Sequence, residues 1–224
     1  MSARRVTVGK ASRGRILVVG DRRSIPAPYA RWLDQAGDIP LSLSVNISAR
    51  QLQEKCLVED VTRALQNSQI EPERLVLEIT ESVFMEDVDT VLERVQQLKA
   101  LGVRLALDDF GTGYSSLGYL NRFPIDIIKI DKTFVDQISG AVEDVALIKA
   151  IIQLSKSFGL STVAEGIEEA GQAERLATLG CLLGQGFLWS RPVPPARSQM
   201  FSSGSSRPPS GSPPSPREWA GAVS

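Results

Sequence analysis

Acidic, amide and lysine side chains stand at or near the ends of successive apolar runs in this sequence. The chain contains no histidine, which excludes histidine acid–base catalysis and histidine-based zinc sites. Oxygen ligands of this kind suit Mg²⁺ or Mn²⁺, and an adjacent aspartate pair can bridge two such ions for phosphodiester hydrolysis. The candidates in chain order are Asn46, Glu78, Glu81, Asp108, Asp109, Lys129, Asp131, Glu165, Glu168 and Gln185.

Taken singly, each of these features has an ordinary structural explanation. An Asp-Asp pair is more often a turn than a metal site, and a single lysine is more often a solvated charge. The combination is more informative, because compatible oxygen ligands follow one apolar run after another. The residues alone therefore indicate metal-assisted phosphodiester hydrolysis.

Short β-rich runs alternate with helix-length periodic segments between residues 41 and 195. This alternation predicts an α/β protein with a parallel sheet, and the lack of a dinucleotide-binding loop favours a TIM-type (β/α)₈ barrel. The barrel is expected to be incomplete at the N-terminus, with about six recognisable βα units. The carboxyl ends of barrel strands share one face, so the candidate residues should converge there. The expected strands are Leu41–Ile47, Leu75–Thr80, Val103–Leu107, Ile125–Ile130, Thr162–Ala164 and Gly186–Trp189.

Helix signals fall between most of these runs. Ser48 and Gln51 form a capping box that predicts a helix continuing to Leu65. A glycine just beyond the last periodic residue predicts where three further helices end. These helices are Val88–Leu101, Val142–Phe158 and Gln172–Leu179.

The two ends differ in composition from the middle, which divides the chain into three parts. Residues 1–29 form a basic segment of uncertain structure, and residues 30–195 form the partial barrel domain. Residues 196–224 are rich in serine and proline and are expected to be disordered. Within the N-terminal part, Arg15–Val19 reads as a strand and Pro28–Ala36 as a helix. This stretch either fills one slot of the barrel or is foreign sequence from a wrong start site or a shifted reading frame.

Bulk properties exclude several classes of partner. The net charge is −1, and the basic N-terminal segment lacks interleaved aromatic residues, so nucleic-acid binding is not expected. No apolar run approaches the length of a membrane span, and no signal-peptide core opens the chain. Cys56 and Cys181 are expected to be buried thiols in a reducing compartment. These features together predict a cytoplasmic protein.

The motifs VNIS, LEITES, LALDDFGTGYSSL, IIKID, VAEGIE and QGFLWSRP occur here in this order. In this order they resemble the EAL-domain phosphodiesterases, bacterial enzymes of cyclic di-GMP signalling, from about Ala30 to Pro195. The resemblance implies a (β/α)₈ barrel that hydrolyses cyclic di-GMP to pGpG with two Mg²⁺ or Mn²⁺ ions. It also implies a possible homodimer that forms through the region of the loop 110–120.

The resemblance also assigns roles to individual residues. Lys129, Asp131 and Glu165 would take part in catalysis, and Gln185 would face the ligand. Glu168 would hold the loop 110–120 in shape, and Gly111 and Gly113 would give that loop its backbone freedom. Glu81 would lie behind the metal ligands. The implied metal ligands are Asn46, Glu78, Asp108, Asp109 and Glu165.

The sequence departs from the family at one functional motif. No Glu-Ala-Leu occurs in the chain, although the family takes its name from that motif and uses its glutamate as a metal ligand. By the family's spacing the motif and a nearby phosphate-binding arginine would fall ahead of Met1. Two alternatives to an active enzyme therefore stay open. One is a catalytically degenerate domain that acts as a cyclic di-GMP receptor or protein-interaction module, and the other is a truncated product without a stable fold.

Overall fold

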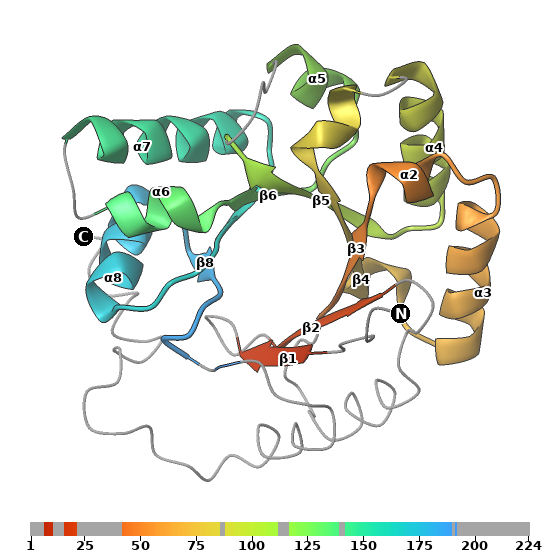
Figure 1. Ribbon diagram of the computed structural model, residues 1–224, viewed down its shortest axis with the longest axis horizontal. Coiled ribbons are helices and arrows are strands. Elements are labelled where there is room, and N and C mark those ends of the chain that lie inside the picture. Colours follow the sequence, from red (N-terminus) through yellow and green to blue (C-terminus); the bar gives the residue numbers. More distant parts are fainter. Residues whose placement is uncertain are drawn as a thin grey trace, which may run out of the picture.

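The computed structural model describes residues 7–10, 16–21, 42–85, 88–111, 117–138, 142–189 and 191. In these residues eight strands form one curved sheet in chain order, and the helices lie around its outer side (Figure 1). The strands are β1 (Thr7–Lys10), β2 (Ile16–Asp21), β3 (Ser42–Ile47), β4 (Leu75–Thr80), β5 (Arg104–Phe110), β6 (Ile127–Ile130), β7 (Ser161–Ala164) and β8 (Leu183–Gly184).

Six parallel strands, β3 to β8, form the curled half-barrel that the alternating pattern predicts. The predicted strand in the N-terminal segment is confirmed as β2, which pairs with β3 in parallel and places Asp21 opposite Asn46. Strand β1 was not predicted, and it pairs with β2 in the antiparallel direction. The proposed helix Pro28–Ala36 and the tail 196–224 lie outside the described residues.

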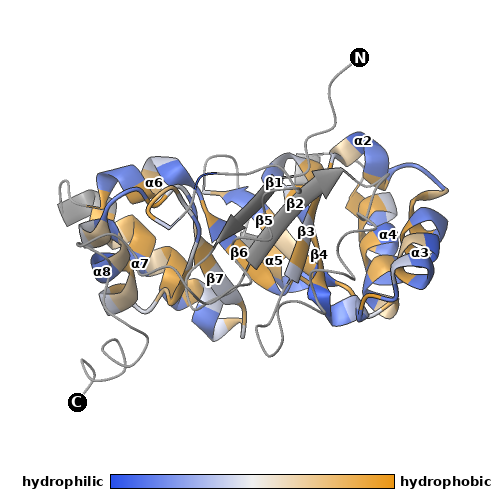
Figure 2. Cartoon of the chain, turned by 90° about the horizontal axis from the view of Figure 1, so that it is seen from below, coloured by the Kyte–Doolittle hydropathy of each residue, from blue (hydrophilic) through white to orange (hydrophobic). Residues whose placement is uncertain are grey.

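Helices connect successive strands and cover the outer face of the sheet (Figure 1). Figure 2 shows hydrophobic segments among the strands and hydrophilic segments on the outer parts of the helices. None of the helices in the described ranges is long and apolar enough to cross a membrane. The helices are α2 (Ala49–Leu52), α3 (Leu57–Ser68), η2 (Pro72–Arg74), η3 (Glu81–Met85), α4 (Val88–Ala100), α5 (Leu117–Arg122), α6 (Lys132–Gln137), α7 (Val142–Ser157) and α8 (Ala170–Leu179).

Two hydrophobic clusters divide the core according to the two faces of the strands. On β4, Leu75, Leu77 and Ile79 belong to the large cluster between the sheet and its helices. The intervening Val76 belongs to a small second cluster with Ala106 and Ile127 from β5 and β6. Because side chains alternate along a strand, this small cluster marks the concave face of the sheet.

The predicted helix that starts at Ser48 is correct at its beginning and wrong in its length. The capping box between Ser48 and Gln51 is present, but the helix ends at Leu52 and a second one begins at Leu57. Both leucines are fully buried. In a single helix, five residues would turn their side chains about 140° apart, so the break lets both face the core.

Two further predictions are corrected. Gly186–Trp189 is not a strand, because β8 is Leu183–Gly184 and the residues after Gln185 form turns. Leu188 and Trp189 instead pack against the core as part of that turn. Cys181 is buried as expected, but Cys56 is exposed because it lies at the break before α3.

Candidate active site

The alternation of side chains positions the candidate residues on one face of the sheet. Glu78 lies two residues after Val76 on β4, and Lys129 lies two residues after Ile127 on β6. Since Val76 and Ile127 mark the concave face, Glu78 and Lys129 project to that same face, nearer the carboxyl ends of their strands. By the same alternation, Asp108 follows Ala106 on β5.

A buried lysine lies at the centre of this group. The Lys129 ammonium is 2.9 Å from Glu78 Oε2, 2.8 Å from Asp108 Oδ1 and 2.6 Å from Glu165 Oε1. Glu78 and Lys129 are only 4% and 5% exposed. Three carboxylates from β4, β5 and the segment after β7 therefore share a single positive charge.

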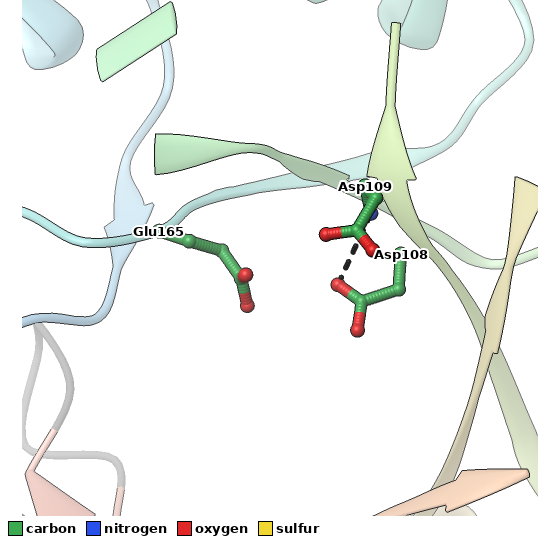
Figure 3. A group of neighbouring side chains, drawn as sticks. All are labelled: Asp108, Asp109 and Glu165. Atoms are coloured by element: carbon green, nitrogen blue, oxygen red, sulfur yellow. Dashed lines mark hydrogen bonds between the residues drawn. The ribbon is translucent and has the colours of Figure 1, made fainter. Parts of the chain in front are cut away.

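Asp108, Asp109 and Glu165 form the part of the site that could hold a metal ion. Each offers a carboxylate oxygen, and these oxygens lie within 4.8 Å of one another. Figure 3 shows the two aspartates on β5 and Glu165 across from them, with Asp108 accepting a hydrogen bond from the Asp109 amide. A set of carboxylate oxygens at this spacing fits a hard divalent cation such as Mg²⁺ or Mn²⁺.

The backbone bends sharply at the end of β5. Asp109 has φ = 56°, a left-handed conformation that few non-glycine residues adopt, and the pairing of β5 with β6 shifts register between Leu107 and Phe110. The buried carboxylate of Glu81 accepts a hydrogen bond of 3.3 Å from the Gly111 amide just beyond the bend. Glu81 therefore holds the backbone that presents the two aspartates.

Glu165 is positioned by a hydrogen bond with Gln185, the residue that directly follows β8. The Gln185 amide donates a hydrogen bond to Glu165 Oε1, and the Gln185 backbone amide donates to the Ala164 carbonyl. The Ile167 amide in turn donates to the Gln185 carbonyl. Gln185 therefore fixes the orientation of the Glu165 carboxylate, and its contact with the ligand stays a prediction.

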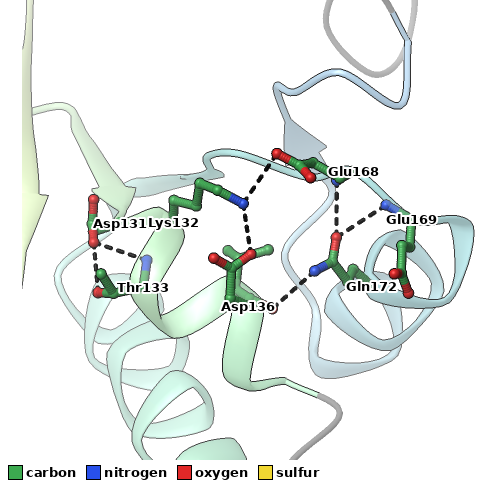
Figure 4. A network of polar contacts seen from close by, with 8 residues as sticks. Asp131, Lys132, Thr133, Asp136, Glu168, Glu169 and Gln172 are labelled. Atoms are coloured by element: carbon green, nitrogen blue, oxygen red, sulfur yellow. Dashed lines mark hydrogen bonds and ion pairs between the residues drawn. The ribbon is translucent and has the colours of Figure 1, made fainter.

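The network shown in Figure 4 joins the start of α6 to the segment after β7. Asp131 accepts hydrogen bonds from the amide and hydroxyl of Thr133 and caps α6. The Lys132 ammonium is 3.2 Å from Glu168. The buried Gln172 accepts hydrogen bonds from the amides of Glu168 and Glu169.

Of the predicted site residues, Asn46 and Glu168 lie outside the ion pairs around Lys129 in the described part of the chain. Asn46 is exposed on β3, where the strand register sets it opposite Glu78. Glu168 contacts α6, whereas the loop residues 112–116, including Gly113, lie outside the described part of the chain. Support of that loop by Glu168 stays a prediction. The support that the structure does describe comes from Glu81, and the sequence carried no signal for its bond to Gly111.

The charged groups of the site shift one another's pKa. Burial disfavours the Lys129 ammonium, but Glu78, Glu165 and Asp108 outweigh it and raise the pKa of Lys129 above its ordinary value. Burial and the carboxylates of Asp108 and Asp131 raise the pKa of Asp109, although Lys129 opposes the shift. Burial acts to raise the pKa of Asp131, but hydrogen bonds from Thr133 outweigh it and lower that pKa.

The raised pKa of Glu165 predicts that the stability of the metal-free protein depends on pH. Burial, opposed by Lys129, raises the pKa of Glu165 to about 7 from its ordinary value of 4.5. Between these values the unfolded chain releases this proton more readily than the folded chain. The free energy of unfolding therefore falls as pH rises through this window, by roughly 3 kcal/mol at most from this group.

The measurement is Tm in EDTA at pH 5 and pH 7.5. Glu165→Gln should gain stability relative to the wild type as pH rises, because the amide cannot ionise. Glu174→Gln, which changes an exposed glutamate on α8, serves as the control. A Tm difference between Glu165→Gln and the wild type that stays constant with pH would contradict the assignment.

Gly186 packs against the segment that carries Glu165. A Cβ atom at Gly186 would lie 2.0 Å from the Ile167 carbonyl oxygen, so the backbone there would have to move. Gly186→Ala should lower Tm by about 2–12 °C, the range expected for overpacking in a domain of this size. Gly171→Ala is the matched control, because a Cβ there meets nothing within 4 Å. Equal Tm values for the two variants would argue against this packing.

Known proteins are similar to this chain over most of its length. The family model described as the EAL domain matches residues 23–192. The Pseudomonas aeruginosa protein named bifunctional diguanylate cyclase/cyclic di-GMP phosphodiesterase MucR is 45% identical over 163 residues, which cover 73% of this chain and 24% of that protein. The chain spans about a quarter of the length of the first curated relatives it matches, at 24%, 21% and 23%.

Solved structures match over most of the chain. The MucR phosphodiesterase in complex with cyclic di-GMP has a TM-score of 0.76 at 32% identity, over 85% of this chain and 92% of that one. The EAL domain of Mycobacterium smegmatis DcpA has a TM-score of 0.79 at 31% identity, over 91% and 97%. A manganese and cyclic di-GMP complex of Klebsiella pneumoniae BlrP1 has a TM-score of 0.75 over 87% and 57%, and at 23% identity it shows the fold alone.

Proposed function

Because the chain belongs to the EAL domain family, we propose that it hydrolyses a phosphodiester bond of cyclic di-GMP and releases linear pGpG. The observation that carries the proposal is the convergence of Asp108, Asp109 and Glu165 around Lys129 at the carboxyl ends of parallel strands. MucR is named as a cyclic di-GMP phosphodiesterase, and its structure is a complex with this ligand. Both support the choice of substrate.

We propose that the carboxylates of the site hold two divalent cations, Mg²⁺ or Mn²⁺. When bound, such ions acidify a water molecule and neutralise charge that develops on the phosphate. Asp108, Asp109 and Glu165 are proposed as ligands because their oxygens already lie close together. Glu78 and Asn46 are proposed as further ligands, because they lie opposite each other on β4 and β3 at the same end of the sheet.

The chain's own residues would supply position and charge. The Lys129 ammonium brings a positive charge to the point where a phosphate and its attacking water would meet, and Gln185 sets the direction of the Glu165 carboxylate. Asp131 is kept ionised by Thr133 and adds negative charge near Asp109. Hydrolysis adds the water oxygen to phosphorus, breaks one P–O bond and gives a proton to the departing oxygen.

One feature of the sequence favours a second function. The chain lacks the Glu-Ala-Leu motif, so a domain that binds cyclic di-GMP or a protein partner without turnover is the alternative. Pairing between two copies through the loop 110–120 and a cytoplasmic location are also proposed.

Assays of turnover and of binding distinguish the phosphodiesterase from the receptor. The purified chain should release pGpG from cyclic di-GMP in Mn²⁺ and should stop doing so in EDTA, as measured by chromatography of the products. Binding without turnover in either condition would favour the receptor. Neither binding nor turnover, in a protein that melts cooperatively, would reject cyclic di-GMP as the ligand. The absence of a cooperative melt would indicate a chain without a stable fold.

A further inference from the structure

Lys129 stands apart from the other half-buried or buried lysines of the described residues in the number of carboxylates it contacts. Its ammonium lies within 2.9 Å of Glu78, Asp108 and Glu165, which come from β4, β5 and the segment after β7. Lys99 offers a comparison: it is partly buried and forms its ion pair with one carboxylate, that of Asp126, at 2.8 Å. Lys129 therefore joins β4, β5 and the segment after β7, whereas Lys99 pairs with one carboxylate, 27 residues away in the sequence.

Three carboxylates at this spacing repel one another unless a positive charge lies between them. In the structure that charge is the Lys129 ammonium, which contacts Asp108 and Glu165, two of the three carboxylates that could hold a metal ion. An ammonium and a divalent cation that contact the same carboxylates repel each other, so each weakens the binding of the other. The two cations are therefore competitors for a single set of ligands.

We propose that Lys129 is the resident cation of the metal-free site and that an entering divalent cation must displace its ammonium from Glu78, Asp108 and Glu165. Until then the ammonium keeps the three carboxylates together and the strands in register. Once displaced, the ammonium is free to contact the anionic phosphate of the substrate. This inference rests on the proposed function, because that function supplies the competing metal.

Removal of the Lys129 ammonium should change stability and metal affinity in opposite directions. The metal-free protein should lose stability, because three carboxylates remain without their shared cation. Metal binding should become tighter, because no ammonium has to be moved. A purely structural role of Lys129 would instead weaken metal binding along with stability.

The experiment compares Lys129→Met with the wild type and with Lys99→Met, which removes a partly buried ammonium elsewhere. Tm is measured in EDTA, and the Kd for Mn²⁺ is measured from the electron paramagnetic resonance signal of the free ion. Lys129→Met should lower Tm by about 6–20 °C. It should tighten Mn²⁺ binding by a factor of about 5–150, the usual range of coupling between two sites. Lys99→Met should lower Tm and leave the Kd for Mn²⁺ unchanged.

A double variant keeps the test decisive if Lys129→Met folds poorly. Lys129→Met with Glu78→Gln removes one negative charge along with the positive one, so it should recover part of the lost Tm in EDTA. Mn²⁺ binding by Lys129→Met that is equal to or weaker than that of the wild type would overturn the proposal, as would no recovery in the double variant. Absence of Mn²⁺ binding in every variant would instead contradict the proposed metal site and the competition together.

Discussion

Replacing Asp108 with asparagine is expected to lower the turnover of cyclic di-GMP more than about 100-fold. Loss of an outer-shell partner of a metal site typically costs 10–100-fold, and Asp108 is proposed as a direct ligand. The amide keeps the shape of the side chain and can still accept hydrogen bonds from Lys129 and from the Asp109 amide. It lacks the negative charge by which a carboxylate strengthens the binding of a divalent cation.

The fold should survive this substitution. Tm of Asp108→Asn in EDTA should equal or exceed that of the wild type, because one of three mutually repelling carboxylates is gone. Asp89→Asn is the matched control, since its side chain is 89% exposed and pairs with Arg122 on the surface. Wild-type turnover by a folded Asp108→Asn protein would show that Asp108 is not part of the catalytic centre.

Removing the Glu81 carboxylate is expected to have the second largest effect. Glu81→Ala leaves the Gly111 amide without this buried acceptor, and an unsatisfied buried group costs about 1–3 kcal/mol. If the bend at Asp109 relaxes by this amount, kcat should fall by a factor of about 5–150, and the Kd for Mn²⁺ should rise.

Glu81→Gln separates the hydrogen bond from the charge. The amide oxygen can accept from Gly111 as the carboxylate does, so this variant should keep most of the turnover that Glu81→Ala loses. Steady-state kcat and KM, with Mn²⁺ affinity measured in parallel, give the result. The role of Glu81 in positioning the aspartates would be refuted by equal turnover in Glu81→Ala and the wild type.

The sequence was sufficient to predict which side chains share one face of the sheet, because strand geometry is regular. Glu78, Asp108 and Lys129 each follow an apolar residue of the concave face by two positions, and parallel strands bring their carboxyl ends to one edge. Apolar runs and strand ends can be recognised without knowledge of tertiary contacts. Apolar runs of strand length likewise predict β3 to β7, whereas β8 ends two residues before the predicted strand Gly186–Trp189.

Features that depend on tertiary contacts were not predicted. The bond from the Gly111 amide to Glu81 joins residues 30 positions apart and depends on the left-handed backbone at Asp109. The apolar run after Gln185 looked like a strand, but close contact between Gly186 and the Ile167 backbone turns the chain there. The central position of Lys129 among three carboxylates likewise follows from packing rather than from spacing.

The carboxylates around Lys129 are proposed to form a divalent-metal centre. The most direct test is anomalous X-ray diffraction at the manganese edge from crystals of the chain grown with Mn²⁺. Anomalous peaks bounded by Asp108, Asp109 and Glu165, with the Lys129 ammonium moved away from these carboxylates, are the predicted result. A protein that binds no manganese there and keeps Lys129 paired with Glu78, Asp108 and Glu165 would contradict the claim.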